Sequence, residues 1–283
     1  MTGQPVVVKF GGELLEQPER LATVVSAMTR VAAHTPLVIV HGGGKEIDAA
    51  LKRAGIEKRQ VDGLRITDEA TLEVVVGVLA GSINTRLVAA LGAAGLRAVG
   101  LTGADGSCGL SDVAPPHRSV DGRTVDLGRV GVPNAGADAG LVRTLLDGRF
   151  VPVVATIGVA ADGRLLNVNA DTFAGRLAER LSARRLVIAG TTAGVLDDNG
   201  ATLAVLEAPG IQRLIGSGTA TAGMIAKLRA CEEALANGVG DVTIVDGRDA
   251  AALEAAVLDR APQSATRIVP TLAVRNLELG IRN

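Results

Sequence analysis

The sequence predicts an α/β fold in which a mostly parallel β-sheet lies between layers of helices. Short apolar runs recur along the chain, and each is continuous rather than alternating in polarity, which is typical of strands buried on both faces. Longer amphipathic segments separate these runs at the spacing of strand–helix–strand units. Glycine is abundant, at 36 of 283 residues against only 10 prolines, which indicates tight turns in an ordered chain rather than disorder.

The order of these elements follows from the pattern of apolar residues. Buried strands are predicted at 5–10 (PVVVKF), 37–40 (LVIV), 97–101 (RAVGL), 151–156 (VPVVAT), 185–189 (RLVIA) and 242–245 (VTIV). Helices are predicted over the apolar stripe from Leu21 to Val31, from the candidate N-cap Thr67 to Gly92 or Gly95, and over 171–181 and 221–238. Residues 102–136 are expected to form hairpins or surface loops, and 266–283 an edge strand followed by an extension.

Composition and charge exclude several classes of function. The net charge is -1, and the chain has no Trp, no Tyr and only 3 Phe, so neither a basic field nor aromatic stacking platforms for nucleic acid are expected. No window reaches the ~18 apolar residues of a membrane span. The two cysteines, Cys108 and Cys231, have no metal-binding spacing, and no signal peptide is evident. We therefore expect a cytoplasmic protein with no nucleic-acid or membrane partner.

Two glycine loops each follow a predicted strand. Gly11 and Gly12 end the first strand two residues after Lys9, and Gly42 to Gly44 follow the second. The carboxyl ends of parallel strands form the ligand crevice of such sheets, and glycine lets anions approach backbone N–H groups there. The second loop fails as a Walker A motif, because Glu46 follows Lys45 where Ser or Thr is required. A lone lysine in the first loop is equally compatible with a side chain that only reaches solvent.

Polar side chains in three other segments are candidate ligand-binding groups. Arg65 precedes the long helix and suits a carboxylate, although an isolated arginine is more commonly a surface residue. Asn167, Asn169 and Asp171 alternate, so an extended segment would place them on one side, while Asp171 alone is also compatible with a helix cap. Lys227 lies at the edge of an apolar helical stripe, where it is compatible with an ordinary partly buried lysine.

Taken in order, these motifs resemble the amino acid kinase family. The segments are KFGG, HGGG, GLRITDEATLEVV, GLTGADG, DLGRVG, NVNAD, GVLDDNG and GMIAK, and they cover about residues 5 to 269. Within the family they are most similar to the branch that phosphorylates N-acetylglutamate in arginine biosynthesis. The resemblance implies an open, three-layer αβα sandwich that acts as a homodimer. It also implies an N-terminal lobe (1–175) for the acylated amino acid and dimerisation, and a C-terminal lobe (176–283) for ATP.

The resemblance assigns a role to each candidate residue. It implies phosphoryl transfer from ATP to the side-chain carboxylate of N-acetyl-L-glutamate, with Mg²⁺ carried by the nucleotide phosphates and no metal ligand from the protein. Lys9 and Lys227 would neutralise the migrating phosphoryl group, and Asp171 would orient both and hold them protonated. The implied substrate-binding residues are Gly43, Gly44, Arg65, Asn167 and Asn169. The implied nucleotide-binding residues are Gly11, Gly12, Thr191, Thr192, Ala193, Gly194, Val195, Leu196, Thr219, Ala220 and Thr221.

Three positions depart from the family pattern. Glu13 stands where a small residue is common, and we expect its carboxylate to point away from the phosphates. Thr191 stands where an aspartate is usual, and Ala222 replaces a common Gly or Asp. Two alternatives stay open: the same chemistry on N-succinylglutamate or another acylated amino acid, and a non-catalytic protein that binds amino acid or nucleotide as a regulator. The acyl preference is not predicted from the residues.

Overall fold

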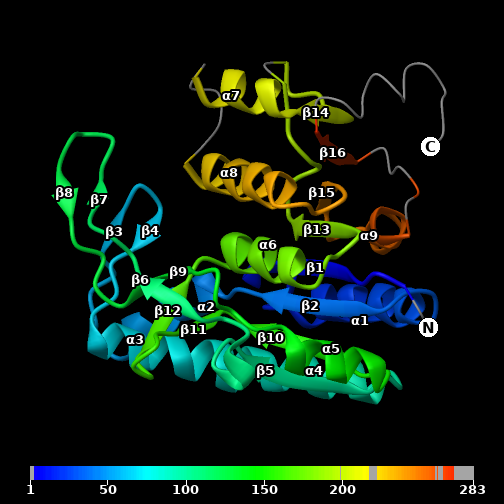
Figure 1. Cartoon of the computed structure of the whole chain (residues 1–283), viewed down its shortest axis with the longest axis horizontal. Coiled ribbons are helices and arrows are strands. Elements are labelled where there is room, and N and C mark those ends of the chain that lie inside the picture. The colour runs from blue at the N-terminus through cyan, green and yellow to red at the C-terminus, as the bar shows by residue number, and fades with distance from the viewer. Residues whose placement is uncertain (1–2, 198, 217–221, 259, 261–263, 271–283) are drawn as a thin grey trace.

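A computed structural model describes residues 3–197, 199–216, 222–258, 260 and 264–270. In these residues eight strands form a central sheet in the order β14-β16-β15-β13-β1-β2-β10-β5. All neighbouring strands are parallel except β15 and β16. Helices cover both faces of this sheet (Figure 1). The predicted three-layer α/β fold with a mostly parallel sheet is confirmed.

The strands and helices occupy the following residues. The central strands are β1 (Val6–Phe10), β2 (Leu37–His41), β5 (Ala98–Thr102), β10 (Val151–Ala155), β13 (Arg185–Gly190), β14 (Val205–Glu207), β15 (Val242–Asp246) and β16 (Ala265–Val269). The helices are α1 (Pro18–Ala32), α2 (Gly44–Arg53), α3 (Glu69–Val76), α4 (Asn84–Ala93), α5 (Gly140–Asp147), α6 (Ala170–Arg180), α7 (Ala208–Gly216), α8 (Ala222–Ala236) and α9 (Ala250–Val257). Short 3-10 turns lie at Gly12–Leu14 and Asp105–Ser107, and a π-helical segment lies at Gly77–Ile83.

Alternation along the buried strands assigns the helices to two faces. Val6, Val8 and Phe10 of β1 belong to the core shared with α1, the α3–α4 segment and α9. Val7 belongs to a second core shared with α5, α6, α7 and α8. Because side chains alternate across a strand, Lys9 projects to the same face as Val7. The period-2 pattern of β1 therefore places an ammonium group on the face where α6 and α8 pack.

The glycine-rich segment after β5 contributes to a second sheet, which the sequence reading missed. Its strands are β11 (Ile157–Val159), β12 (Leu165–Val168), β9 (Val130–Pro133) and β6 (Ser111–Val113), in that order. Two hairpins lie beside it in Figure 1, β3 (Gln60–Val61) with β4 (Leu64–Arg65), and β7 (His117–Arg118) with β8 (Thr124–Val125). The β7–β8 hairpin lies within residues 102–136, where hairpins or surface loops were predicted. The strands of the second sheet are only three or four residues long and bounded by Gly, Asp and Pro, so local pattern did not indicate them.

Two further expectations are corrected at the ends of elements. Thr67 is not the N-cap of α3, because the side chain of Asp68 accepts the N–H of Thr71 at 2.9 Å and so caps the helix. The strand near the C-terminus, β16, is not an edge strand, because β14 pairs with its far side. The sequence reading did not find β14, which has only three residues. Most of the expected C-terminal extension, residues 271–283, lies outside the described residues.

The segment Glu69–Ala93 is helical as predicted, but it differs from the expectation that no window of the chain is apolar enough to span a membrane. With a mean hydropathy of 1.8 it is apolar and long enough to cross a membrane by length and composition alone, and 39% of that window is buried within the chain. Its buried face, which includes Leu79, Ile83 and Leu87, belongs to the core beneath the central sheet. A helix that packs on a core passes the same hydropathy test as a membrane span, so composition does not distinguish the two.

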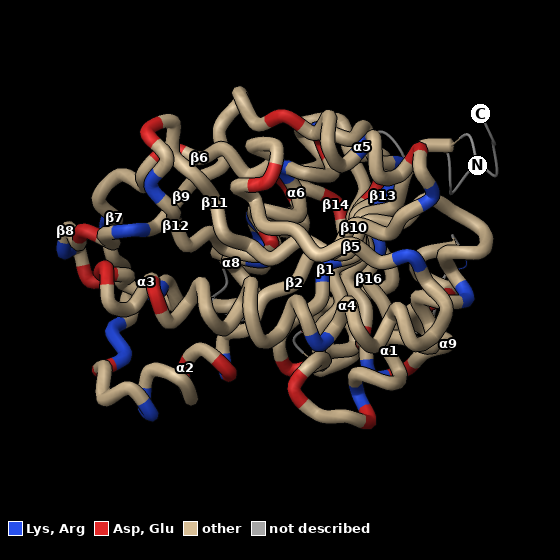
Figure 2. Tube along the Cα trace, turned by 90° about the horizontal axis from the view of Figure 1, so that it is seen from below, with Lys and Arg blue, Asp and Glu red and all other residues tan. Residues whose placement is uncertain are grey.

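The two halves of the chain share one continuous sheet. β1 pairs with β2 on one side and with β13 on the other, and this β1–β13 pair joins the strands before and after residue 175. Residue 175 itself lies inside α6. Figure 2 shows basic and acidic positions interspersed around the outside of the chain, with mostly uncharged residues along the central strands.

Candidate active site

The two predicted glycine loops meet at one edge of the central sheet. β1 and β2 are parallel neighbours in register, so their carboxyl ends lie side by side. A Cβ added to Gly12 would lie 2.6 Å from the Cα of Gly43. This contact is possible only without side chains, because real Cβ atoms do not approach that closely. The loops therefore form one backbone surface, as the sequence predicted from strand ends.

Lys9 and Asp171 form a buried ion pair at this edge. Lys9 Nζ lies 2.8 Å from Asp171 Oδ1, and the two residues are only 7% and 8% exposed. Burial alone would raise the pKa of the Asp171 carboxyl, but the charges of Lys9 and Lys227 outweigh it and hold that pKa below its ordinary value. The carboxylate is therefore charged and interacts with both lysines, which come from elements more than 200 residues apart in the chain.

Lys227 reaches the same place from α8, which packs against α6. Its Nζ lies 3.8 Å from where a side chain of Gly190 would begin, at the end of β13. Burial and the charge of Lys9 lower the pKa of Lys227, while Asp171, Cys231 and Glu13 act in the opposite direction. Asp171 therefore acts to keep this lysine protonated, as the resemblance implied, but desolvation is larger and the pKa of Lys227 is lowered overall.

Glu13 points into the site, contrary to expectation. A Cβ at Gly11 would lie 2.6 Å from the carboxyl carbon of Glu13, and one at Gly190 would lie 3.6 Å from its Oε1. The side chain thus folds back over the first glycine loop. The reason is the 3-10 turn Gly12–Leu14, which reverses the chain just after β1.

Arg65 lies at the end of the β3–β4 hairpin, and within the part of the chain that the structure describes only one of the two terminal nitrogens of its guanidinium makes hydrogen bonds. Its Nη2 donates to Asp48 Oδ1 at 2.5 Å and lies 3.4 Å from the carbonyl of Gly44. Its Nη1 is buried and, among the described residues, has no hydrogen-bond partner. A buried unpaired donor is costly, so this atom is poised for an acceptor that the chain does not supply.

A buried hydroxyl links Arg65 to Asn167. Thr67 is fully buried, donates to the carbonyl of Arg65 at 3.1 Å and accepts the Nδ2 of Asn167 at 3.1 Å. The two predicted carboxylate-binding side chains therefore share one support. The sequence offered Thr67 only as a possible helix cap, because the link to Asn167 spans 100 positions.

Asn169 and Asp171 occupy different local positions from those predicted. Asn169 is the N-cap of α6, and its Oδ1 accepts the N–H of Asp171 at 2.9 Å and that of Thr172 at 3.1 Å. Asp171 lies in the first turn of that helix rather than in an extended segment. Both still face the same cavity as Asn167, which comes from β12.

Nine of the predicted residues line one cavity of about 280 Å³, whereas Lys227 is not among its lining residues. The cavity brings together Lys9, Gly11, Gly12, Gly43, Gly44, Arg65, Asn167, Asn169 and Asp171 from the predicted set, and adds Glu13, Gly42, Ile47, Gln60, Gly63, Leu64, Leu79, Val130, Thr156, Val168 and Ala170. The apolar members had no distinguishing signal in the sequence. The lining includes basic, amide and apolar side chains, which suits a small molecule that has both carboxylate and apolar groups.

Not every glycine amide in the loops is available to a ligand. The N–H of Gly11 donates to the carbonyl of Ala189 at 3.1 Å, and that of Gly42 donates to Phe10 at 3.1 Å. Gly11 therefore provides space rather than a free donor, which narrows the role expected from the sequence. Gly12 and Gly43 lie at helix N-termini, where backbone N–H groups have no intrahelical partner.

The predicted nucleotide-binding stretch Thr191–Leu196 follows β13 and is attached to β16. The N–H of Val195 donates to Thr266 Oγ1 at 2.7 Å, and the side chain of Val195 is buried in the core. The carbonyl of Val195 accepts the N–H of Leu203 at 2.8 Å, so neither its side chain nor its backbone is open to a ligand, whereas Leu196 is 45% exposed. The other predicted stretch, Thr219 to Thr221, lies outside the described residues.

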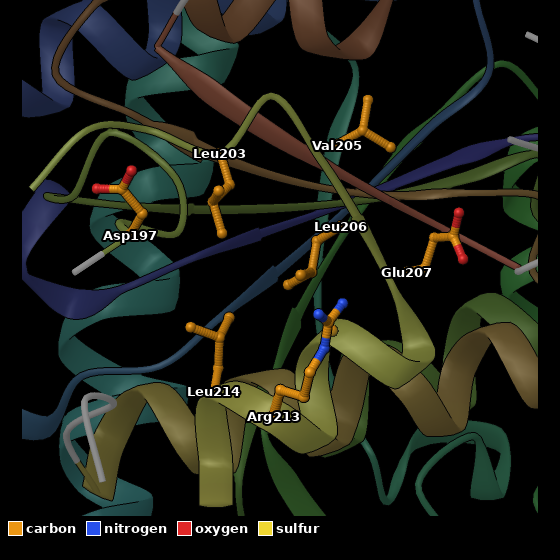
Figure 3. Close-up of a pocket in the computed structure, with 8 residues that line it drawn as sticks. Asp197, Leu203, Val205, Leu206, Glu207, Arg213 and Leu214 are labelled. Carbon is orange, nitrogen blue, oxygen red and sulfur yellow. The ribbon is translucent and has the colours of Figure 1, made fainter. Parts of the chain in front are cut away.

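A second cavity of about 510 Å³ adjoins this stretch, between β14 and α7. Figure 3 shows Leu203, Leu206 and Leu214 grouped at its centre, with Asp197 and Glu207 at opposite sides. Arg213 of α7 points toward Leu206. Apolar walls with a few polar groups at the rim are typical of sites for flat organic rings.

A buried imidazole supports the second glycine loop. His41, which ends β2, is fully buried, and its Nε2 lies 3.0 Å from Asn84 Nδ2. Asn84 also donates to the carbonyl of Val153 at 2.9 Å. Burial, aided by the charge of Arg86, lowers the pKa of His41 to about 4. A neutral imidazole therefore fixes the start of this loop.

Comparisons with known proteins agree with this geometry. Residues 4–246 match the amino acid kinase family. This chain belongs to that family. The acetylglutamate kinase of Acidiphilium cryptum (strain JF-5) is 40% identical over 253 residues, covering 87% of this chain and 84% of the relative. The acetylglutamate kinase of Sphingopyxis alaskensis is 41% identical over 253 residues, covering 87% and 83%.

Solved structures of this family share its architecture. An N-acetylglutamate synthase from Neisseria gonorrhoeae, complexed with coenzyme A and N-acetyl-glutamate, superposes with a TM-score of 0.79 at 25% identity. That match covers 94% of this chain and 59% of the synthase. A carbamate kinase from Giardia lamblia bound to AMP-PNP gives a TM-score of 0.68 at 18% identity, over 95% of this chain and 99% of that kinase, and shows the shared fold.

Proposed function

We propose that this protein is a kinase that transfers the γ-phosphoryl group of ATP to the side-chain carboxylate of N-acetyl-L-glutamate, giving N-acetyl-L-glutamyl 5-phosphate in arginine biosynthesis. The observation that carries the proposal is the placement of Lys9, Asp171 and Lys227 around one point, beside a cavity that Arg65 and Asn167 line. The relatives of about 40% identity that carry this enzyme name support the choice of substrate.

The geometry supports direct transfer between the two substrates. An oxygen of the substrate carboxylate attacks the γ-phosphorus, and the bond to the ADP oxygen breaks, so no covalent enzyme intermediate is needed. Lys9 and Lys227 stabilise the negative charge on the transferring group, and Asp171 fixes both ammonium groups. Arg65 binds the α-carboxylate, with Asn167 lining the same cavity. This keeps the reacting carboxylate at the lysine end of the cavity.

The protein groups present fit a metal that arrives with the nucleotide. The described residues contain no cluster of three or more His, Cys, Asp or Glu side chains that could hold an ion. Mg²⁺ is commonly held by one or two carboxylates together with substrate phosphates, and the carboxylate of Glu13 fills the space above Gly11 beside the cavity. When bound, Mg²⁺ neutralises phosphate charge.

The proposal also assigns one substrate to each half of the chain. Residues 1–175 would bind the acylated amino acid and form the dimer contact, and 176–283 would bind ATP along Thr191–Leu196, with its base in the cavity between β14 and α7. The apolar segment Glu69–Ala93, only partly buried in one chain, supports a homodimer, which light scattering after size exclusion would measure. A cytoplasmic location and the lack of nucleic-acid and membrane partners stay predictions from composition.

A coupled assay tests the function. Purified protein with MgATP is offered N-acetylglutamate, N-succinylglutamate or glutamate, and hydroxylamine traps any acyl phosphate. We expect hydroxamate with N-acetylglutamate. Product from the succinyl compound alone would change the substrate, and no product from any acceptor would indicate a non-catalytic regulator.

A matched pair of variants tests the carboxylate-binding role. Arg65→Ala should raise KM for the acylated amino acid by at least about tenfold, because a charge-assisted hydrogen bond is lost, while KM for ATP changes little. Arg59→Ala removes a half-exposed arginine from the same hairpin region and should leave both values within about twofold. Equal effects of the two variants would contradict the role of Arg65.

A further inference from the structure

The carboxylate of Glu13, which lies beside the cavity and is a candidate Mg²⁺ ligand, also lies close to Lys227. This carboxylate and the ammonium of Lys227 lie close to Gly190, since Oε1 and Nζ lie 3.6 and 3.8 Å from the point where a side chain there would begin. Gly11 is covered by the same carboxylate. An acidic and a basic group therefore lie beside the same backbone position, at the ends of β1 and β13.

The backbone of the 3-10 turn Gly12–Leu14 is anchored, but the Glu13 carboxylate takes no part in that anchoring. Arg20 Nη1 donates to the backbone carbonyl of Glu13 at 3.0 Å, which anchors the turn without engaging the side chain. Among the described residues, no ion pair within 4.0 Å and no hydrogen bond involves the Glu13 carboxylate. Its influence is electrostatic, because it acts to raise the pKa of Lys227 against the larger effects of burial and Lys9. The structure thus holds a half-buried acid beside the lysines without pairing it.

The charge at this point selects among forms of a nucleotide. Lys9 and Lys227 are matched by Asp171 and Glu13, so the group has two basic and two acidic members. A metal-free phosphate chain brings only negative oxygens, and it would be repelled by Glu13 while it is attracted by Lys227. A phosphate chain that carries Mg²⁺ has a positive centre beside negative oxygens, which complements a carboxylate and an ammonium that lie beside the same residue, Gly190.

We propose that Glu13 is a positioning residue that makes the site select the Mg²⁺-bound form of the nucleotide, with its carboxylate toward the metal and Lys227 toward the phosphate oxygens. The inference rests on the proposed kinase function. It gives Glu13 a positive role, whereas the sequence suggested only an unfavourable acid that points away.

Affinity measurements with and without metal test this directly. Isothermal titration of ADP is carried out in excess Mg²⁺ and in EDTA on the wild type, Glu13→Gln and Glu16→Gln. Glu13→Gln keeps the shape and removes the charge, and Glu16→Gln makes the same change at an exposed position three residues on. For Glu13→Gln we expect MgADP to bind more weakly and metal-free ADP more tightly, so that the preference for MgADP falls by about tenfold. Glu16→Gln should change neither affinity by more than about twofold.

Each other outcome has a definite meaning. If Glu13→Gln tightens both forms equally, Glu13 is only a counter-ion of Lys227, and the proposal is overturned. It is also overturned if the ratio of the two affinities is unchanged. Glu13→Ser, which has a small side chain, is the second variant should Glu13→Gln fail to fold, and it should lose the same preference. A wild type that binds neither form would instead contradict the proposed kinase function.

Discussion

Two neighbouring strand ends hold buried basic side chains in opposite ways. Lys9 in β1 and His41 at the end of β2 each precede a glycine loop, and Phe10 pairs in register with His41. Lys9 lies against a carboxylate, at 2.8 Å from Asp171. His41 lies against an amide, at 3.0 Å from Asn84 Nδ2. The partner decides whether a buried basic group carries charge for chemistry or stays neutral as a support.

The neutral state of His41 follows from its contacts. Asn84 Nδ2 also faces the carbonyl of Val153, which can only accept, so this atom is the amide nitrogen and donates to both. The imidazole Nε2 must then accept, and a proton there would meet another donor. Burial adds the cost of an unpaired charge. One sheet edge thus contains a charged pair that faces the cavity and a neutral pair that faces the core.

Among substitutions that test this difference between Lys9 and His41, the largest effect is expected at Lys9. Lys9→Met should lower kcat by about 100-fold or more, because a preorganised cation at the transferring group is lost. Steady-state kinetics measures this, and urea melts measure the cost of leaving Asp171 unpaired, on the order of 3 kcal/mol. Lys45→Met, at an exposed lysine after the second glycine loop, is the control and should be near wild type. If Lys9→Met unfolds while its folded fraction turns over normally, Lys9 is a structural residue.

The next largest effect is expected at Asp171, whose carboxylate interacts with Lys9 and Lys227. Asp171→Asn should lower kcat on the order of 10- to 100-fold by misplacing both ammonium groups. Asp171 acts to raise the pKa of Lys227, so its loss lowers that pKa further. The alkaline limb of the kcat/KM profile should therefore move to lower pH. A fall in kcat with an unmoved limb would argue that Asp171 does not act on Lys227.

The neutral imidazole of His41 predicts that the stability of the fold depends on pH. The pKa of His41 is about 4 in the folded state against 6.5 as its model value, so the unfolded chain takes up the proton first as pH falls. The free energy of unfolding should drop by on the order of 2 kcal/mol between pH 7 and pH 5 from this residue.

Urea melts at the two pH values measure the contribution of His41. His41→Gln should remove that part of the drop, whereas His34→Gln, at an exposed histidine, should keep it. An identical pH dependence in wild type and His41→Gln would show that the imidazole is already protonated in the fold.

The smallest effect is expected at Thr67, a second neutral support. Thr67→Val keeps the shape but removes the hydroxyl between Arg65 and Asn167, so KM for the acylated amino acid should rise about three- to tenfold with kcat within about twofold. Thr29→Val, on a helix away from the cavity, is the control and should leave KM unchanged. A fall in kcat with constant KM would place Thr67 in the transfer step instead.

Local pattern predicted those parts of the molecule that short stretches of sequence determine. Continuous apolar runs located six of the eight central strands, and the glycine loops after them located the edge where Lys9, Asp171 and Lys227 meet. The second sheet was missed because its strands are short and pair across distant turns. β14 and the position of β16 were missed for the same reason.

The residues that support the site, His41 and Thr67, were not predicted from the sequence because their roles depend on contacts with residues far along the chain. The hydrogen bond of His41 with Asn84 spans 43 positions, and that of Asn167 with Thr67 spans 100. No local signal indicates such pairs. The direction of Glu13 depends on a single 3-10 turn, and the expectation that like charges repel placed it on the wrong side.

The central place of β1 has a mechanical consequence. Because β1 lies between β2 and β13, any rocking of one half of the molecule against the other would displace the outer strands most and β1 least. Under the proposed function, the amino acid would bind on one side of β1 and the nucleotide on the other, so the ammonium of Lys9 would be the group that such a motion displaces least.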